Sequence, residues 1–272
     1  MSIIRAMSHP KRNWALVLGA SSGFGEAASI ALAKSGRNVF GVHLDRRATL
    51  PNVERIASEI EDAGGRASFF NVNAADAAKR AEVIAAMRET IAADAEQPAV
   101  DVVLHSLAFG TLKPFLGDEK ERMTQAQMDM TLNVMAHSLV YWTQDLVARG
   151  MVGRGSRIFS MTSEGSHRVV PNYGAVGAAK AALEAHTRQL AMELGPRGVL
   201  VNCIQAGVTD TPALRKIPGN EIMIETTLRR NPGGRMTRPE DVAATIAALS
   251  QPAVQFVSGS VIFVDGGEDV VG

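Results

Sequence analysis

A tyrosine and a lysine stand seven positions apart in the segment Asn172–Lys180. On an α-helix each residue turns by about 100°, so positions seven apart lie on the same face, two turns from each other. Asn172 is a plausible N-cap for such a helix, which places Tyr173 and Lys180 on one face. A nearby ammonium lowers the pKa of a phenol, which makes Tyr173 a candidate acid or hydrogen-bond donor to a substrate oxygen. On the spacing alone, a core tyrosine and a surface lysine are the simpler explanation.

A glycine-rich turn follows the first apolar run of the chain and precedes a helix candidate. Glycine lets the backbone turn sharply and approach a ligand closely, and the free amides of a helix start favour an anion. The spacing GxxxGxG differs from the GxGxxG pattern but predicts a site for the pyrophosphate of a dinucleotide. A purely structural turn between strand and helix is the alternative. The residues expected to hold the cofactor here are Gly19, Ser21, Ser22, Gly23, Phe24 and Gly25.

The choice between NAD(H) and NADP(H) depends on the end of the second expected strand, His43–Arg47. An acidic residue, here Asp45, would accept a hydrogen bond from the 2′-hydroxyl of the ribose and favour NAD(H). Arg46 and Arg47 would pair with a 2′-phosphate and favour NADP(H), unless they are ordinary solvated surface. Counted from Gly36, the strand end falls nearer His43 than Asp45, so we expect NADP(H), with NAD(H) as the alternative.

Apolar, β-branched runs alternate along the chain with alanine-rich segments of helical period. This alternation predicts βαβ units, and therefore an α/β fold with a parallel sheet of seven strands covered by helices on both faces, a single doubly wound (Rossmann) domain. The expected strands are Trp14–Leu18, Asn38–Leu44, Ala67–Val72, Val100–His105, Arg157–Met161, Val199–Ile204 and Ser260–Val264. The expected helices are Gly25–Lys34, Val53–Ala63, Ala75–Ala92, Ala126–Arg149, Tyr173–Leu194 and Pro239–Leu249.

The domain is expected to cover residues 13–272, after an N-terminal tail at 1–12. One stretch, Thr211–Arg235, is rich in Pro, Gly, Arg and Met and has little pattern. It follows the carboxyl end of a strand, where ligands bind in such sheets. We therefore expect a mobile lid over the site at about 211–235, with a plain surface loop as the alternative.

The composition is that of an ordinary globular protein. The chain has 272 residues, 46% of them hydrophobic, and a formal net charge of zero, which argues against nucleic-acid binding driven by bulk charge. No stretch approaches the length of a membrane span, and the start lacks an apolar run of signal-peptide length. The single cysteine, Cys203, permits no internal disulfide, so a cytoplasmic location is expected.

Taken together, the glycine turn, the order of the elements, the helix that Tyr173 opens and the closing Val264–Gly267 resemble the short-chain dehydrogenase/reductase family. The resemblance runs from about Trp14 to Gly267, nearly the whole chain. It implies that Tyr173 and Lys180 are catalytic and that Lys180 also binds the ribose hydroxyls of the cofactor.

Three features are similar to the enoyl-acyl-carrier-protein reductases within that family. Most of the family has its tyrosine four residues before the lysine, where this chain has Val176, whereas enoyl reductases have it seven residues before, like Tyr173. The run His105–Phe109, His-Ser-Leu-Ala-Phe, resembles the His-Ser-Ile-Gly-Phe of enoyl reductases. The segment Gly195–Asn202 is also similar to that subgroup.

Two residues depart from the common enoyl reductase pattern. Ser163 stands ten residues before Tyr173, where many enoyl reductases carry a second tyrosine, and seventeen before Lys180, where ordinary family members keep a catalytic serine. This arrangement resembles the NADPH-preferring branch of enoyl reductases. Asn133 matches the asparagine with which ordinary members hold a water near the lysine. The resemblance therefore implies catalytic roles for Ser163 and Asn133, and leaves the substrate more open than the chemistry.

The resemblance also assigns contacts to the cofactor outside the glycine turn. Residues after the third and fourth strands would meet the adenine and the ribose, and those after the sixth strand would meet the carboxamide and the phosphates. In chain order these are Asn73 with Ala74 for the adenine, Ser106, Leu107 and Ala108 for the ribose, Gly207, Val208 and Thr209 for the carboxamide, and Thr211 for the phosphates.

The function that the resemblance implies is hydride transfer to the carbon–carbon double bond of a 2-enoyl thioester of acyl-carrier protein or CoA, as in fatty acid synthesis. A carbonyl reductase or alcohol dehydrogenase is the alternative enzyme, and a non-catalytic NADP(H)-binding regulator is an alternative of another class. No metal, nucleic-acid or membrane partner is expected. Relatives pair their long helices, so we expect a homotetramer. Candidates for the wall around the acyl chain are Phe109, Met161, Ile217, Ile222 and Met223.

Overall fold

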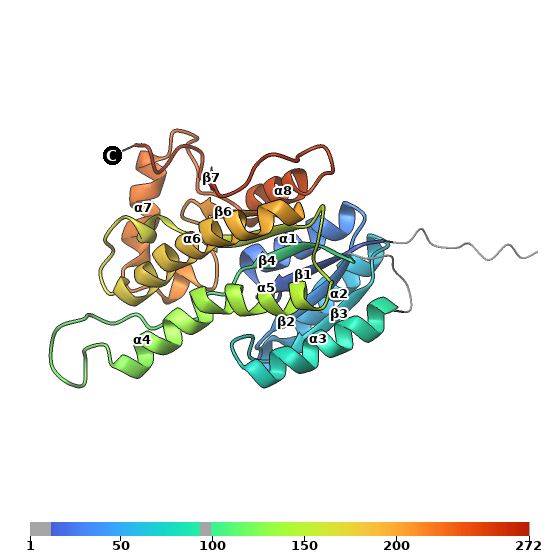
Figure 1. Ribbon diagram of the computed structural model, residues 1–272. Coiled ribbons are helices and arrows are strands. Elements are labelled where there is room, and N and C mark those ends of the chain that lie inside the picture. Colours follow the sequence, from blue (N-terminus) through green and yellow to red (C-terminus); the bar gives the residue numbers. More distant parts are fainter. Residues whose placement is uncertain (1–11, 93–98, 272) are drawn as a thin grey trace, which may run out of the picture.

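The computed structural model describes residues 12–92 and 99–271, so the expected tail at 1–12 lies outside the described residues except for Arg12. Seven strands form one sheet in the order β3-β2-β1-β4-β5-β6-β7, and every pair is parallel (Figure 1). This confirms the predicted Rossmann fold. The strands are β1 Trp14–Leu18, β2 Asn38–His43, β3 Ala67–Asn71, β4 Val100–His105, β5 Arg157–Thr162, β6 Leu200–Ala206 and β7 Val261–Val264.

Helices cover both faces of the sheet because successive side chains of a strand point to opposite faces. On β1, Leu16 and Leu18 join one buried cluster, whereas Ala15 and Val17 join the other. Helices α3, α5 and α6 pack on the first face, and α1, α2 and α8 on the second. The helices are α1 Gly23–Lys34, α2 Leu50–Asp62, α3 Ala77–Ala92, α4 Gln125–Leu132, α5 Ser138–Ala148, α6 Gly174–Leu194, α7 Asn220–Arg230 and α8 Pro239–Leu249.

The segment predicted as a helix over Ala126–Arg149 is helical from Gln125 to Ala148, but it is not α-helical throughout. It divides into α4 and α5 around a π-helical turn at Asn133–His137. The hydroxyl of Ser138, which follows the turn, donates a 2.8 Å hydrogen bond to the carbonyl of Val134, and such bonds to the backbone four residues back often bend helices. The wider turn places Val134 and Met135 against the cavity described below.

The stretch predicted as a lid, Thr211–Arg235, contains a short 3₁₀ turn at Leu214–Lys216 and helix α7. This helix has no buried apolar stripe, since Thr227 is its only buried residue, which is why the hydrophobic pattern did not reveal it. It lies beside the C-terminal end of the chain (Figure 1). Motion of this segment as a lid stays a prediction. None of the helices in the described part of the chain is long and apolar enough to cross a membrane.

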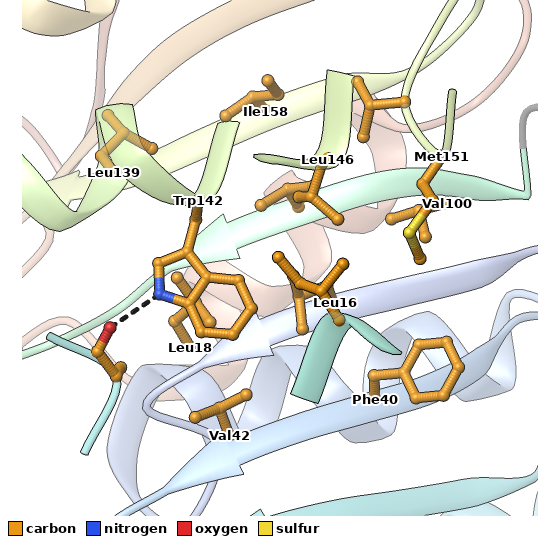
Figure 2. Packing of buried hydrophobic residues seen from close by; sticks show 14 of the residues in the cluster. Leu16, Leu18, Phe40, Val42, Val100, Leu139, Trp142, Leu146, Met151 and Ile158 are labelled. Atoms are coloured by element: carbon orange, nitrogen blue, oxygen red, sulfur yellow. Dashed lines mark hydrogen bonds between the residues drawn. The ribbon is translucent and has the colours of Figure 1, made fainter. Parts of the chain in front are cut away.

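Trp142 of α5 lies at the centre of the larger core cluster, fully buried near Leu16, Leu18 and Val42 (Figure 2). Its indole Nε1 donates a 2.8 Å hydrogen bond to the carbonyl of Ala74, a residue on the rim of the cavity. The indole therefore fastens the loop after β3 to α5.

Replacement of Trp142 by phenylalanine is expected to lower the free energy of unfolding by about 1–3 kcal/mol, because the buried carbonyl of Ala74 loses its donor. Replacement by alanine, which also leaves a cavity, is expected to cost about 3–5 kcal/mol. Urea unfolding followed by circular dichroism measures both. Equal stability of the phenylalanine variant and the wild type would contradict the role assigned to the hydrogen bond.

Candidate active site

A cavity of about 970 Å³ opens at the carboxyl ends of the central strands. Its lining includes Gly19 after β1, Asp45 after β2, Ser106 after β4, Ser163 after β5 and Gly207 after β6. The strand order reverses between β1 and β4, and in open α/β sheets ligands bind in the crevice outside the carboxyl ends of the strands at such a switch point. The predicted phosphate turn and the predicted Tyr173–Lys180 face therefore meet in one cavity.

Most of the residues predicted from the sequence line this cavity. Three of them do not line it. Gly25 packs against the backbone of Gly19, Arg47 begins an exposed 3₁₀ turn after β2, and Asn133 begins the π-helical turn. The predicted residues that line the cavity are Gly19, Ser21, Ser22, Gly23, Phe24, Asp45, Arg46, Asn73, Ala74, Ser106, Leu107, Ala108, Ser163, Tyr173, Lys180, Gly207, Val208, Thr209 and Thr211, with Phe109, Met161, Ile217 and Met223 of the expected acyl wall. Ile222 of that wall lines a smaller adjoining pocket.

The glycine turn leaves no room for a side chain at two of its glycines. Gly19 has a φ of +89°, and a Cβ there would lie 2.4 Å from the carbonyl oxygen of Ser106. A Cβ on Gly25 would lie 2.0 Å from the carbonyl oxygen of Gly19. No side chain of the described chain caps the start of α1 at Ser22. The first amides of α1 are thus open to an anion, and the turn fits a pyrophosphate group.

A tight turn delivers Tyr173 to the cavity. The Tyr173 amide donates a 3.1 Å hydrogen bond to the carbonyl of Val170, with Pro171 and Asn172 between them. Asn172 has a φ of +62°, and asparagine tolerates this left-handed conformation better than most residues. The prediction that Asn172 caps α6 was wrong: Tyr173 itself holds the N-cap position, because Asn172 is used in the turn.

The hydroxyl of Tyr173 faces Ser163, and their oxygens are 3.5 Å apart. Burial raises the pKa of Tyr173, the hydrogen bond with Ser163 lowers it in part, and the charge of Glu164 raises it further. The expected lowering of this pKa by Lys180 is therefore wrong: Lys180 is not among the groups that shift it, and burial has the largest effect. Since the phenol stays protonated at neutral pH, it can donate a hydrogen bond or a proton.

Lys180 is buried, which excludes the surface-lysine interpretation. Its Nζ donates a 2.7 Å hydrogen bond to the carbonyl of Met161 at the end of β5. Burial lowers the pKa of Lys180 to about 8, although Cys203 and Glu184 oppose the shift. The ammonium is therefore held on the cavity floor in an environment that penalises its charge.

His105 is the last residue of β4 and precedes Ser106, which lines the cavity. From the sequence it was identified only as the first residue of the His105–Phe109 motif. It is fully buried, and its Nε2 lies 2.8 Å from the hydroxyl of Ser138. Burial lowers the pKa of His105 to about 3, and the positive charge of Lys180 adds to the shift. The neutral imidazole ties the strand end to the π-helical turn.

The carboxylate of Asp45 is fixed at the end of β2. The Nδ1 of His43 lies 2.9 Å from its Oδ2, and Asn71 exchanges hydrogen bonds with its backbone at 3.0 Å. Burial raises the pKa of Asp45, but hydrogen bonds with Ser21, Thr49 and His43 outweigh it and hold the pKa below its usual value. An ionised carboxylate therefore stands beside the glycine turn, while the side chain of Arg46 at the cavity rim is exposed.

Sequence reasoning missed four carboxylates of the lining, which are Glu164, Asp265, Glu268 and Asp269. Glu164 and Glu268 are the two that also line the smaller pocket of about 270 Å³. Glu164 follows Ser163, and burial together with the charge of Glu268 raises its pKa. Isolated carboxylates in loops carry no spacing signal, so only the fold reveals that they face the site.

Comparisons with known proteins agree with this geometry. A family model described as enoyl-(acyl carrier protein) reductase matches residues 19–268. A cyclohexanol dehydrogenase from Rhodococcus sp. (strain TK6) is 31% identical over 269 residues, which cover 93% of this chain and 94% of the relative. The NADH-dependent enoyl-acyl-carrier-protein reductase of Aquifex aeolicus (strain VF5) is 31% identical over 174 residues, only 64% of either chain and less than two thirds of that relative. A short-chain dehydrogenase from Burkholderia cenocepacia J2315, solved in complex with NADP, is 27% identical with a TM-score of 0.79 over 95% of this chain and 98% of its own.

Proposed function

Because the chain belongs to the short-chain dehydrogenase/reductase family, we propose that it reduces the carbon–carbon double bond of a 2-enoyl thioester. Members of this family are nicotinamide-dependent oxidoreductases, and this chain is one of them. Our proposal concerns its substrate. The observation that carries the proposal is the position of Tyr173, seven residues before Lys180, with its hydroxyl beside Ser163 in the cavity. Val176, at the usual place of the family tyrosine, is buried and offers no polar atom.

The lining residues divide the reaction among them. When bound, the nicotinamide supplies a hydride to the β-carbon of the thioester, which leaves negative charge on the thioester oxygen. Tyr173 donates a hydrogen bond or proton to that oxygen, where the charge develops. Ser163 orients the phenol or acts as a second donor, and the ammonium of Lys180 would bind the ribose hydroxyls. Asn133 lies outside the lining, so any part it takes would be indirect.

The walls around these groups support an acyl substrate. Phe109, Met161, Ile217 and Met223 present apolar surface to the same cavity that contains Tyr173. The side chain of Phe109 is largely exposed, so it can cover a bound chain without disturbing the core. An apolar wall of this kind favours a hydrocarbon chain over a highly hydroxylated substrate.

The test is consumption of NADH or NADPH by the purified protein in the presence of crotonyl-CoA or a longer enoyl thioester, followed at the absorbance of the reduced nicotinamide. Turnover with the enoyl thioester and none with a 3-ketoacyl thioester is the expected result. Tight cofactor binding without turnover on thioesters, ketones or alcohols would instead support a cofactor-binding regulator.

A second function, reduction of a carbonyl or oxidation of an alcohol, is favoured by two observations. Ser163 lies within hydrogen-bond reach of Tyr173, the pair that ordinary family members use on carbonyl substrates. The cyclohexanol dehydrogenase relative, similar over almost the whole chain, also favours it. Oxidation of NAD(P)H by acetoacetyl-CoA but not by crotonyl-CoA would select this function over the first.

The sequence favours NADP(H) as the cofactor because of Arg46 and Arg47. We propose NAD(H) instead, and the position of Asp45 supports this choice. An ionised carboxylate fixed beside the glycine turn would accept hydrogen bonds from the ribose hydroxyls and would repel the negative charge of a 2′-phosphate. Relatives of both kinds exist, one named for NADH and one solved with NADP.

Wild-type protein is therefore expected to bind NADH at least about tenfold more tightly than NADPH, and Asp45→Asn to narrow or reverse that ratio. Arg46→Ala is the matched variant and is expected to leave NADH affinity unchanged. Fluorescence titration of each reduced cofactor measures the ratios. A wild type that prefers NADPH, and loses the preference in Arg46→Ala, would restore the NADP(H) interpretation.

We also propose that the chain assembles as a homotetramer. Large apolar side chains are exposed on β7, the edge strand of the sheet, and on the outer faces of α5 and α6, at Phe263, Tyr141 and Met192. Burial of such surface between copies is favourable. Size-exclusion chromatography with light scattering is expected to give four times the chain mass of 28.9 kDa.

A further inference from the structure

The C-terminal segment Asp265–Val271 carries a carboxylate into the wall between the main cavity and the smaller pocket. Glu268 lines both, yet it is only 2% exposed. No lysine or arginine of the described chain forms an ion pair with its side chain. Burial of a carboxylate without a cationic partner costs free energy, so hydrogen bonds to its oxygens are needed to stabilise it.

The two carboxylate oxygens of Glu268 bind two different elements. Oε1 accepts a 2.6 Å hydrogen bond from the hydroxyl of Thr227 on α7. Oε2 accepts a 3.2 Å hydrogen bond from the amide of Val208 in the loop after β6. Thr227 is as buried as Glu268. One side chain thus connects the helix beside the substrate wall with the loop that the resemblance assigns to the carboxamide of the nicotinamide.

The backbone of the same segment strengthens this connection. Arg230 of α7 donates 3.1 Å hydrogen bonds to the carbonyls of Glu268 and Val271. The loop approaches the carboxylate so closely that a Cβ on Gly207 would lie 2.7 Å from Oε2 of Glu268. Figure 1 shows α7 lying next to the C-terminal end of the chain. Helix α7, the loop after β6 and Glu268 are therefore joined by hydrogen bonds into one unit.

We propose that Glu268 is a positioning residue that couples the placement of α7 to the binding of the nicotinamide end of the cofactor. The proposal rests on the proposed function, because it requires the nicotinamide to lie at Val208. Glu268 holds the Val208 amide at one oxygen and α7 at the other, so a change in either bond is transmitted to the other element. The glycine turn expected to hold the pyrophosphate, and the Asn73–Ala74 segment expected to hold the adenine, are outside this unit.

The test uses a variant that does not touch the nicotinamide loop. Thr227→Val removes the hydroxyl on α7 with little change of shape, and the dissociation constants of NADH and of ADP-ribose are measured by titration calorimetry. NADH is expected to bind about tenfold more weakly, since a hydrogen bond to a charged group is disturbed, whereas ADP-ribose binding should change less than about twofold. Thr227→Ser, which keeps the hydroxyl, is expected to restore wild-type affinity. Thr226→Val, the preceding residue on α7, is the matched control.

Each outcome decides the proposal. Equal weakening of both ligands, no weakening of either, or the same effect in Thr226→Val would overturn the coupling. A wild type that binds neither ligand would refute the proposed function and the coupling with it. If thermal unfolding shows that Thr227→Val is not folded, Glu268→Gln replaces it: an amide offers one acceptor oxygen for two donors, so the same selective loss of NADH affinity is expected.

Discussion

Replacement of Tyr173 by phenylalanine is expected to lower the turnover of an enoyl thioester by about a thousandfold or more. General acid catalysis and a donor aimed at developing charge each contribute factors of about a hundred or more, and the phenol would supply both here. The pKa of Tyr173 is raised by burial, so the hydroxyl carries its proton at neutral pH and can give it up only to a stronger base, such as the enolate oxygen. The ring itself remains in the variant.

The same variant should bind the cofactor within about twofold of the wild type, because the assigned cofactor contacts lie elsewhere in the cavity. Steady-state kinetics and a cofactor titration measure the two effects separately. Tyr141→Phe is the matched control: this tyrosine lies on α5, half exposed beside Arg80 and outside the cavity lining. Full activity of Tyr173→Phe would refute the assignment of the acid.

The sheet and its two helical layers could be predicted because their signals are local. Each strand is a short apolar run, and the strand at Val100–His105 was predicted to the residue. The glycine turn is also readable from local sequence, since its three glycines lie at the junction of one strand and the next helix, although Gly19 is needed for a close contact with Ser106 after β4.

Features that depend on tertiary contacts could not be predicted. The π-helical turn at Asn133–His137 lies within an unbroken helical pattern, because its cause is packing around Ser138 and His105. Helix α7 has no buried apolar stripe, and its side chains instead donate hydrogen bonds to the C-terminal segment. The role that the resemblance assigns to Asn133 stays a prediction, because the residue begins the π-helical turn and does not line the cavity itself.

In the electrostatics of the site, too, local features could be predicted from the sequence and features that depend on tertiary contacts could not. The spacing predicted that Tyr173 and Lys180 share a helix face; the structure brings both to one cavity, with Tyr173 at the N-cap just before the first turn. The direction of the pKa of Tyr173 was wrong because it depends on how much water the folded chain removes, which no sequence pattern reports. Asp45 and His43 are two residues apart, yet only the fold shows that they bind each other.

Lys180→Met is expected to lower turnover by about a hundredfold or more and, at neutral pH, to make the protein more stable. The methionine keeps an unbranched apolar chain of similar length but removes a buried charge. A pKa lowered from 10.5 to about 8 corresponds to a penalty on the order of 3 kcal/mol in the folded state. Loss of the hydrogen bond to the carbonyl of Met161 offsets about 1–3 kcal/mol of the gain, so the net gain is at most about 2 kcal/mol.

The dependence on pH distinguishes this cause from better packing. Below about pH 8 Lys180 is protonated in both the folded and the unfolded chain, so the full penalty is present. Between about 8 and the unfolded value of about 10.4 the unfolded chain binds more protons, so the free energy of unfolding of the wild type gains from this group as the pH rises. The advantage of Lys180→Met is therefore expected to be largest at pH 7 and to shrink towards pH 10, as measured by urea unfolding at both values. An advantage that is the same at pH 7 and pH 10 would mean that Lys180 is not held as a buried charge, and an inactive variant with lower stability at pH 7 would assign the lysine a structural role.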